Sequence, residues 1–421
     1  RTVDVVGLDT LVHVANGIYD NCPNDEAHEL FKLPDFINKM MENKWLGSKS
    51  GQGFYKKEGK EILTLDLDTL EYRASKKASF ATLELTKTID KPIDRFKVLV
   101  KGKDKAGEFY RKNFASMFQY CSNRIPEITD AFYKIDDAMK AGFGWENGPF
   151  EIWDAIGVEK GIELMRAEGY EPAAWVNEML AAGVTTFYAV KEGSTYFYSI
   201  TNKKLEKVPG QDAFIILNNI RESKKIWNNS DSIITDLGDG IINLEFTSKM
   251  NSIGAGVLQG INKAIDIAEK EYNGLVIGNQ GTNFSVGANL GMIFMMAVEQ
   301  EYDELNMAIK MFQDTMMRCR YSAIPVIAAP HGMTLGGGCE LTMHADRAVA
   351  AAETYIGLVE FGVGVIPGGG SKEMALRASD LFRKNDVELN VLQEYFLTVG
   401  MAKVATSAYE GFDTGVLQKG R

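Results

Sequence analysis

The sequence has 421 residues, of which 45% are hydrophobic and 24% charged, as in an ordinary water-soluble globular protein. At about 150 residues per domain, this length predicts about three domains. The net charge of −11 argues against nucleic acid and anionic membrane surfaces as partners, and no segment has the roughly 18 apolar residues that a bilayer span requires. Four scattered cysteines without a C-x-x-C pair, and four histidines without ligand spacing, predict a reduced cytoplasmic protein with no metal site.

The first sixty residues predict helices followed by a glycine-rich turn. One helix face is marked by apolar residues at helical spacing: Leu11, Val14, Ala15 and Ile18. Phe36 to Met41 predicts a second helix, and Gly47 to Gly53 then closes on Phe54-Tyr55. The motifs GLDT and KSGQGFY resemble the C-terminal helical domain of 3-hydroxyacyl-CoA dehydrogenases. The resemblance implies that the NAD-binding half, with its catalytic His–Glu pair and G-x-G-x-x-G turn, precedes this domain in the parent protein.

A second copy of the same pattern follows in the sequence. The segment GPFEIWDAIGVEKGIELM echoes the start of the chain, with Asp154 standing 150 residues after Asp4. The later segment WVNEML echoes FINKMM, and the alignment pairs Tyr196-Phe197-Tyr198 with Gly53-Phe54-Tyr55. Asn123 falls where the dehydrogenase family often keeps a substrate-contacting Asn, and in a second copy it has either that role or a structural one. The repeat predicts two tandem helical domains that bury a face against each other.

Composition divides the chain into five segments. We expect a partial first copy over 1–60, a charged linker or insertion over 61–95, and the second copy over 96–200. A Lys-rich linker over 201–230 then leads to a domain over 231–421 in which strands and helices alternate. Because the sequence opens within a motif and stops without a closing element, we expect it to be a piece of a longer protein.

Two glycine-rich turns in the last segment bracket two glutamates. Gly336-Gly337-Gly338 runs into a helix that begins near Cys339, and Ile366 to Gly370 forms the second turn. Glu340 follows the first turn, and Glu360 precedes the second by a few residues. A helix N-terminus exposes free backbone N–H groups at the positive end of the helix dipole, which favours developing negative charge.

An earlier turn, FSVGANL over residues 284–290, follows an apolar strand and offers further backbone N–H groups. Two N–H donors with two carboxylates suit the formation of an enolate from an acyl thioester. Taken alone, each feature is more often structural, because glycine also serves close packing and a glutamate near a helix start also complements the dipole. Their order and spacing together favour a catalytic site.

On these motifs the last segment resembles the crotonase superfamily of enoyl-CoA hydratases and isomerases. The resemblance implies an α/β spiral fold in which the N–H groups of Ala288 and Gly337 form an oxyanion hole. It also implies that Glu340 and Glu360 are the two catalytic glutamates of a hydratase. We assign Glu340 as the base for water and Glu360 as the proton donor, with the reverse assignment left open. The CoA moiety is expected at one turn: Ser285, Val286 and Gly287.

We therefore expect hydration of trans-2-enoyl-CoA to 3-hydroxyacyl-CoA in fatty-acid β-oxidation, as one half of a bifunctional protein. The resemblance implies no cofactor for the hydratase, NAD for the dehydrogenase half, and a homo-oligomer, with a thiolase partner left open. Two alternatives remain, a crotonase-fold isomerase and a non-catalytic assembly fragment. A helical tract over 290–321 is rich in methionine, which suits either an acyl-chain wall or core packing with a trimer contact.

Overall fold

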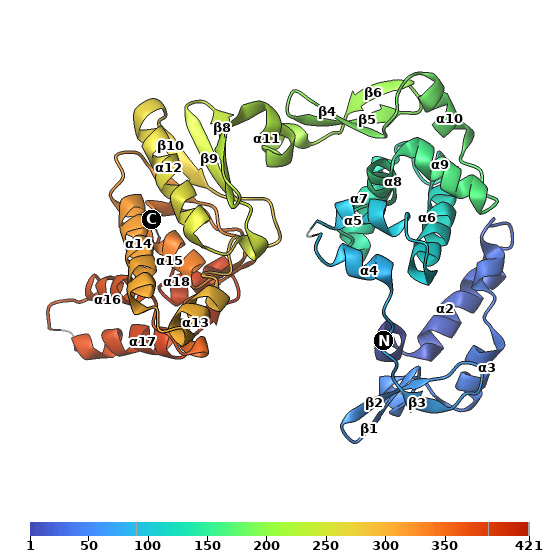
Figure 1. Ribbon diagram of the computed structural model, residues 1–421, viewed down its shortest axis with the longest axis horizontal. Coiled ribbons are helices and arrows are strands. Elements are labelled where there is room, and N and C mark those ends of the chain that lie inside the picture. The colour runs from blue at the N-terminus through green and yellow to red at the C-terminus, as the bar shows by residue number, and fades with distance from the viewer. Residues whose placement is uncertain (90, 386, 420–421) are drawn as a thin grey trace. The chain divides into compact units, whose positions relative to one another are not determined.

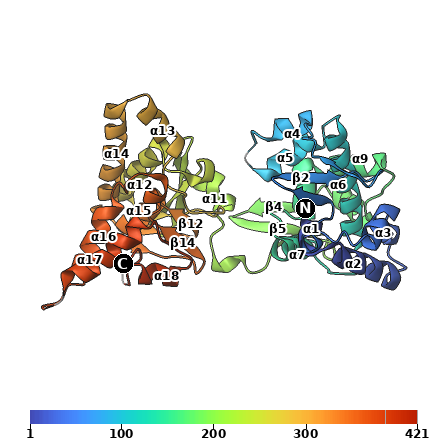
Figure 2. The ribbon, with the colours of Figure 1, turned by 90° about the horizontal axis from the view of Figure 1, so that it is seen from below.

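Two units divide the chain in the computed structural model, which describes residues 1–89, 91–385 and 387–419. The first unit is Arg1–Ala189 with Tyr196–Glu206, and the second is Val190–Thr195 with Lys207–Arg421. Figure 1 follows the chain from blue N-terminal helices to red C-terminal helices, and Figure 2 gives the view turned by 90°. None of the helices in the described residues combines the length and apolar character that a membrane crossing requires.

The first unit begins with three helices and a small antiparallel sheet in the order β1-β2-β3. The elements are α1 (Thr2–Val6), α2 (Leu8–Asn21), α3 (Asp35–Glu42), β1 (Tyr55–Glu58), β2 (Glu61–Leu65) and β3 (Tyr72–Ala74). Their shared core is buried aliphatic: Leu8, Ile37, Met40 and Leu65. Both helices expected here are present. Leu8 and Val12 of α2 pack into this core, whereas Leu11 and Val14 of the predicted face are exposed.

The segment expected to be the second copy has more helices and another three-stranded sheet, β4-β5-β6. The helices are α4 (Ala81–Thr86), α5 (Pro92–Leu99), α6 (Lys105–Asn123), α7 (Tyr133–Phe143), α8 (Pro149–Ile156), α9 (Val158–Ala167) and α10 (Ala174–Ala181). The strands are β4 (Tyr188–Lys191), β5 (Ser194–Ser199) and β6 (Lys204–Lys207). Aromatic rings fill the core, where Phe118 on α6 stacks on Trp153 on α8 with 4.8 Å between ring centroids.

The two segments expected to be copies have one carboxylate motif in common. Asp4 accepts the backbone N–H groups of Phe54 and Tyr55 at 2.9 and 2.8 Å. Asp154 accepts those of Phe187 and Tyr188 at 2.7 and 2.9 Å. The counterpart of Phe54-Tyr55 is therefore Phe187-Tyr188, and the sequence alignment with residues 196–198 is wrong. That alignment followed aromatic composition, whereas the position is fixed by which N–H groups reach the aspartate.

Three further predictions need correction. The two segments are not all-α, since each carries a three-stranded sheet. The segment 61–95 is not a linker: it supplies β2, β3 and α4, and the Tyr72 hydroxyl donates to the Gly53 carbonyl at 2.6 Å. The segment 201–230 likewise contains β6, α11 (Leu217–Lys224) and β7 (Lys225–Asn228). Arg221 on α11 pairs with both carboxylate oxygens of Glu245, at 3.0 and 2.8 Å, which ties this segment into the second unit.

The second unit is built on a six-stranded sheet in the order β13-β11-β10-β9-β8-β7. The strands are β8 (Ser232–Gly238), β9 (Ile241–Phe246), β10 (Gly274–Ile277), β11 (Val326–Ala328) and β13 (Arg347–Ala348), together with β7. β9, β10, β11 and β13 run parallel, and β7 and β8 are antiparallel to their neighbours. Helix α12 (Ala255–Glu271) connects β9 to β10 and buries the face predicted for it: Val257, Leu258, Ile261, Ala264, Ile265 and Ala268.

A second, three-stranded sheet and several helices complete this unit. The sheet runs β12 (Gly332–Leu335), β14 (Thr354–Gly357) and β15 (Val404–Ala405). The helices are α13 (Leu290–Val298), α14 (Tyr302–Arg320), α15 (Gly337–His344), α16 (Gly370–Ser379), α17 (Glu388–Gly400) and α18 (Ala408–Asp413), with the 3-10 turn η5 (Glu360–Val363). The methionine-rich tract is two helices, because Gln300 adopts a positive φ of 61° between them. Most of its methionines are exposed on this chain: Met292, Met295, Met307, Met311 and Met317.

Candidate active site

The first turn, residues 284–288, is held by contacts to the rest of the second unit. Ser285 is fully buried, and its Oγ accepts the N–H of Gly287 at 3.1 Å. The carbonyl of Gly287 accepts the N–H of Ile253 at 2.8 Å, and Gly287 has a φ of 90° that favours glycine. Within the described residues the N–H of Ala288 has no hydrogen-bond partner, so it is available to a ligand.

The turn before α15, residues 335–337, lies directly against the turn at residues 284–288. The N–H of Leu335 donates to the Ser285 carbonyl at 2.9 Å, which joins the two segments just before α15 begins. A Cβ on Gly287 would lie 3.0 Å from the backbone nitrogen of Gly337. Gly337 is the first residue of α15, and an N–H at that position has no acceptor within its own helix. The structure thus brings the two predicted N–H donors, of Ala288 and Gly337, to adjoining turns.

Glu340 lies one turn into α15 and is 3% exposed. Its Oε1 accepts the N–H of Gly369 at 2.6 Å and that of Gly370 at 2.7 Å. These N–H groups form the N-terminus of α16, so the carboxylate also meets the positive end of that helix dipole. Burial raises the pKa of Glu340, and the two hydrogen bonds oppose that rise.

Glu360 begins η5 and has a different environment. Both of its carboxylate oxygens are buried and have no hydrogen-bond partner in the described part of the chain. A Cβ on Gly336 would lie 3.4 Å from Glu360 Oε1, so the carboxyl group is beside the turn that leads to Gly337. Burial, together with the charge of Glu340, raises the pKa of Glu360 to about 7. One carboxylate is therefore held by hydrogen bonds, and the other is poised to carry a proton near neutral pH.

This arrangement provides the parts of an acid–base site for an enolisable carbonyl. Two free N–H groups on adjoining turns can stabilise a developing oxyanion, and losing one such donor typically costs about 3 kcal/mol of barrier. Two carboxyl groups in unlike environments, Glu340 and Glu360, can divide the roles of base and acid between them.

Comparison with known proteins shows which families the chain resembles. Residues 237–380 match the enoyl-CoA hydratase/isomerase family. Residues 1–57 match the 3-hydroxyacyl-CoA dehydrogenase C-terminal domain. The second unit therefore contains the region that resembles hydratases and isomerases, and the predicted resemblance to both families is confirmed.

Two relatives align with this chain from end to end or nearly so. A probable 3-hydroxyacyl-CoA dehydrogenase of Bacillus subtilis is 44% identical over all of this chain and 53% of its own length. A putative fatty acid oxidation complex trifunctional enzyme of Rickettsia felis is 27% identical over 89% of this chain and 48% of its own. The chain thus spans about half the length of these relatives.

Solved structures of enoyl-CoA hydratases are also similar to part of the chain. The enzyme of Bacillus anthracis is 22% identical over 44% of this chain and 68% of its own, with a TM-score of 0.37. The enzyme of Polaromonas sp. JS666 is 24% identical over the same shares, with a TM-score of 0.38.

Residues 285–287 form the turn predicted to contact CoA, and many of their polar groups are hydrogen-bonded within the protein. In the hydratase/isomerase domain Ser285 has its N–H, carbonyl and hydroxyl all hydrogen-bonded within the fold. The backbone groups of Gly287 are bonded as well. These bonds shape the turn, and the assignment of Ser285, Val286 and Gly287 to CoA binding stays a prediction.

Three further polar residues do not join Glu340 and Glu360. Cys339 is fully buried, and burial raises the pKa of its thiol well above the usual value, which argues against a nucleophile. His331 contacts the Gly281 carbonyl through Nε2 at 2.8 Å. In the first unit, Asn123 donates to Glu26 Oε2 at 2.9 Å, a contact between the two copies that favours its structural role.

Sequence reasoning missed the residues that hold Glu340. The turn ending at Gly370 was expected to accompany Glu360, whereas its N–H groups bind Glu340. The sequence did contain a signal for this contact, because three consecutive glycines stand at the start of a helix. Such a pattern favours the binding of an anion, and the anion here is a carboxylate of the same chain.

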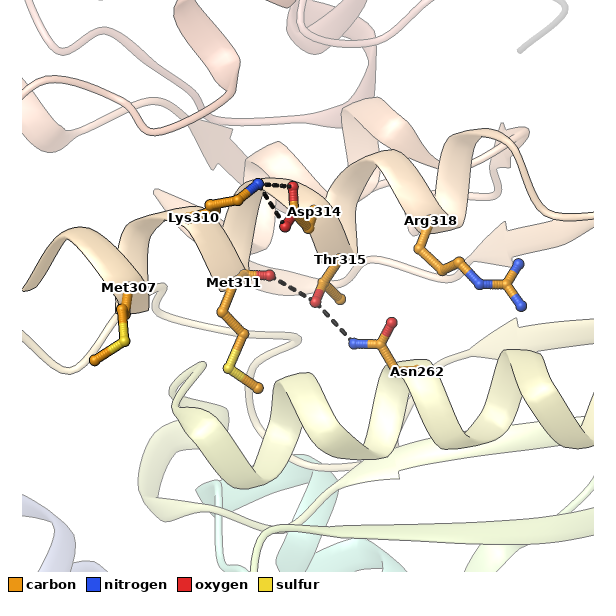
Figure 3. Close-up of a pocket in the computed structure, with 7 residues that line it drawn as sticks. All are labelled: Asn262, Met307, Lys310, Met311, Asp314, Thr315 and Arg318. Atoms are coloured by element: carbon orange, nitrogen blue, oxygen red, sulfur yellow. Dashed lines mark hydrogen bonds and ion pairs between the residues drawn. The ribbon is translucent and has the colours of Figure 1, made fainter. Parts of the chain in front are cut away.

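A surface groove of about 470 Å³ between α12 and α14 lies apart from these glutamates (Figure 3). Its polar groups are engaged with one another: Asn262 donates to Thr315 at 2.8 Å, and Lys310 donates to Asp314 at 2.9 Å. Arg318 at one end pairs with Glu269 at 2.5 Å. Because these charges are neutralised within the protein, the groove offers no unpaired group to an anionic ligand.

Proposed function

We propose that the hydratase/isomerase domain hydrates trans-2-enoyl-CoA to 3-hydroxyacyl-CoA as part of fatty-acid β-oxidation. The observation that carries the proposal is the pair of unlike carboxyl groups. Glu340 is fixed by two N–H groups, whereas Glu360 is buried without a partner and has a pKa raised to about 7. Hydration needs both a base for water and an acid for carbon, and this pair supplies one of each.

In the proposed reaction, the thioester carbonyl accepts hydrogen bonds from the N–H groups of Ala288 and Gly337. Glu340 takes a proton from water as the water oxygen forms its bond to C3. The electrons of the C2=C3 double bond move toward the thioester as an enolate, and Glu360 delivers its proton to C2. Glu340 ends protonated and Glu360 ionised, and exchange with solvent restores both. The assignment of the two roles follows the hydrogen bonds, because a fixed carboxylate orients water better than a free one.

NAD belongs to the dehydrogenase half of this proposal and not to hydration. The dehydrogenase relatives favour NAD in the whole protein, but the present sequence contains no G-x-G-x-x-G turn to cradle the pyrophosphate. We therefore assign no residue of this chain to NAD.

The setting of the protein follows from the same proposal. We place it in the cytoplasm, where its four free cysteines would stay reduced. An acyl-CoA is the proposed substrate. A homo-oligomer is proposed because the helices of the second unit leave large apolar side chains exposed. A thiolase partner would cleave the 3-ketoacyl-CoA that the dehydrogenase half forms from the hydration product.

Loss of enoyl-thioester absorbance from crotonyl-CoA tests the proposal. We expect hydration by the parent chain and a loss of at least a hundredfold in both Glu340→Gln and Glu360→Gln. Glu353→Gln, which changes an exposed glutamate before β14, is the matched control and should keep parental activity. Activity that survives either catalytic substitution, or conversion of a 3-enoyl-CoA without hydration, would contradict the proposal and favour an isomerase.

A further inference from the structure

Gln313, on α14, contacts the turn that holds Glu340. Its Nε2 donates to the carbonyl oxygen of Gly368 at 2.7 Å. That carbonyl shares a peptide group with the N–H of Gly369, which donates to Glu340 Oε1 at 2.6 Å. One peptide group therefore joins the side-chain amide of Gln313 to the carboxylate of Glu340.

Such a connection has an electrostatic consequence. Hydrogen bonds in a chain polarise one another, so a donor on the Gly368 carbonyl makes the N–H of Gly369 a stronger donor. A stronger donor favours the ionised form of Glu340 and restricts where its carboxylate lies. We propose that Gln313 is a positioning residue for Glu340 and acts through the peptide between Gly368 and Gly369.

The surroundings of Gln313 support a fixed geometry. The neighbouring Phe312 packs against the turn before α15 and the turn before α16. A Cβ on Gly337 or on Gly368 would lie 3.3 Å from its ring. Further along α14, Arg320 pairs at 2.5 Å with Glu373 of α16, the helix that begins at this turn. The contacts of Phe312 and Arg320 thus hold α14 against the turn before α16. Gln313 lies between these two residues in the sequence.

Other charged and titratable groups also lie near Glu340, and their influence on its pKa must be distinguished from that of Gln313. Glu360 on η5 interacts with it through charge, Cys339 precedes it on α15, and His344 contacts its carbonyl through Nδ1 at 2.7 Å. None of them contacts Gln313 among the hydrogen bonds of the described residues. A change made at Gln313 therefore reaches Glu340 through the peptide group.

The test is a titration of the Glu340 carboxyl by carbon NMR on protein labelled in glutamate, with the signal assigned by Glu340→Gln. We expect its pKa to rise by about 0.5 in Gln313→Leu, which keeps the size and removes the donor. Gln313→Lys restores a donor and should return the pKa toward the parental value. Asp314→Asn, at the next residue of α14, is the matched control and should leave it unchanged.

Kinetics give a second measurement, which rests on the proposed hydratase activity. With crotonyl-CoA we expect kcat to fall about threefold to tenfold in Gln313→Leu with KM unchanged, and to recover in Gln313→Lys. An unchanged Glu340 pKa in Gln313→Leu, or a rise that Asp314→Asn reproduces, would overturn the inference. An inactive parent chain would overturn the proposed function alone, because the titration needs no turnover.

Discussion

The N–H of Gly370 donates to Glu340 Oε1 at 2.7 Å, so a carboxylate on α15 caps the N-terminus of α16. Glu360 has no such support, and both of its carboxylate oxygens are buried without a partner in the described residues. Two carboxyl groups in one small region thus have opposite surroundings. We expect this difference to determine how the rate of the proposed hydration depends on pH.

Hydration should slow as the pH rises through about 7. Burial and the charge of Glu340 raise the pKa of Glu360 to about 7, and the proposed proton donor must be protonated before it acts. Its protonated fraction is high below that pH and falls above it, so kcat/KM should fall on the alkaline side. A profile of kcat/KM for crotonyl-CoA from pH 5 to pH 9 measures this. A rate that climbs through pH 7 would mean that Glu360 is the base, reversing the two roles.

Gly287→Ala should abolish most activity without unfolding the second unit. The added Cβ would lie 3.0 Å from the Gly337 nitrogen and 2.8 Å from the Leu335 carbonyl oxygen, so the two turns must move apart. Losing the alignment of one oxyanion donor typically costs about a hundredfold to a thousandfold in kcat.

Gly364→Ala is the control for the backbone strain of Gly287→Ala. Gly364 also has a positive φ, 84°, but a Cβ there meets nothing within 4 Å. Both variants carry the same kind of strain, and only one of them disturbs the turns. Equal losses of crotonyl-CoA hydration in the two variants would show that strain, and not the approach of the turns, explains the effect.

Arg377→Met should destabilise the second unit strongly. Arg377 is buried, pairs with Glu373 at 3.0 Å, and donates to the carbonyls of Met343 and Val416. Removing it leaves a buried, less compensated carboxylate, which typically costs about 3–5 kcal/mol. Calorimetry should show a lower unfolding temperature for one transition only, because the first unit does not contain this pair.

A double substitution separates the charge from the packing. Arg377→Met with Glu373→Met removes both buried charges and should recover much of the lost stability. Lys310→Met breaks an exposed pair with Asp314 and should cost less than about 0.5 kcal/mol. A double variant as unstable as the single one would assign the loss to packing and to the carbonyl contacts.

Local patterns predicted the parts of the site that lie close together in sequence. A helix after the three glycines, expected to begin near Cys339 and found to begin at Gly337, follows from turn chemistry, and the buried face of α12 follows from periodicity. The partners of Glu340 lie 29 and 30 residues further along the chain, and no spacing rule gives such a contact. A tertiary contact of this kind depends on how α16 packs against α15.

The error in the repeat alignment and the failure to predict the strands of the first unit have related causes. The β1 sequence YKKE has no run of apolar residues, so its strand is set by the pairing with β2. The aspartate side chains fix the position of β1 and β4 in the two copies, since each accepts two N–H groups there. A sequence comparison that matches aromatic residues cannot detect which N–H groups a carboxylate reaches.

The stability of the first unit should decrease as pH rises from about 4 to about 7. Burial raises the pKa of Asp154, and likewise that of Asp136, from 3.8 to about 7. A raised folded-state pKa means that the folded protein binds the proton more tightly than the unfolded chain. The resulting stability is therefore complete below about pH 3.8 and is lost as pH rises through about 7. The unfolding temperature of this unit, measured by calorimetry between pH 4 and pH 8, should fall across this range.

Asp154→Asn tests the origin of that slope. Asn keeps one acceptor oxygen for Phe187 or Tyr188 but cannot accept both N–H groups, so the variant should be less stable by about 1–3 kcal/mol. It also removes one titrating group, so its unfolding temperature should vary less with pH than that of the parent. The matched control is Asp137→Asn on α7, which changes an aspartate whose side chain is largely exposed and should leave the slope unchanged. An unaltered slope in Asp154→Asn would mean that the pH dependence arises elsewhere in the unit.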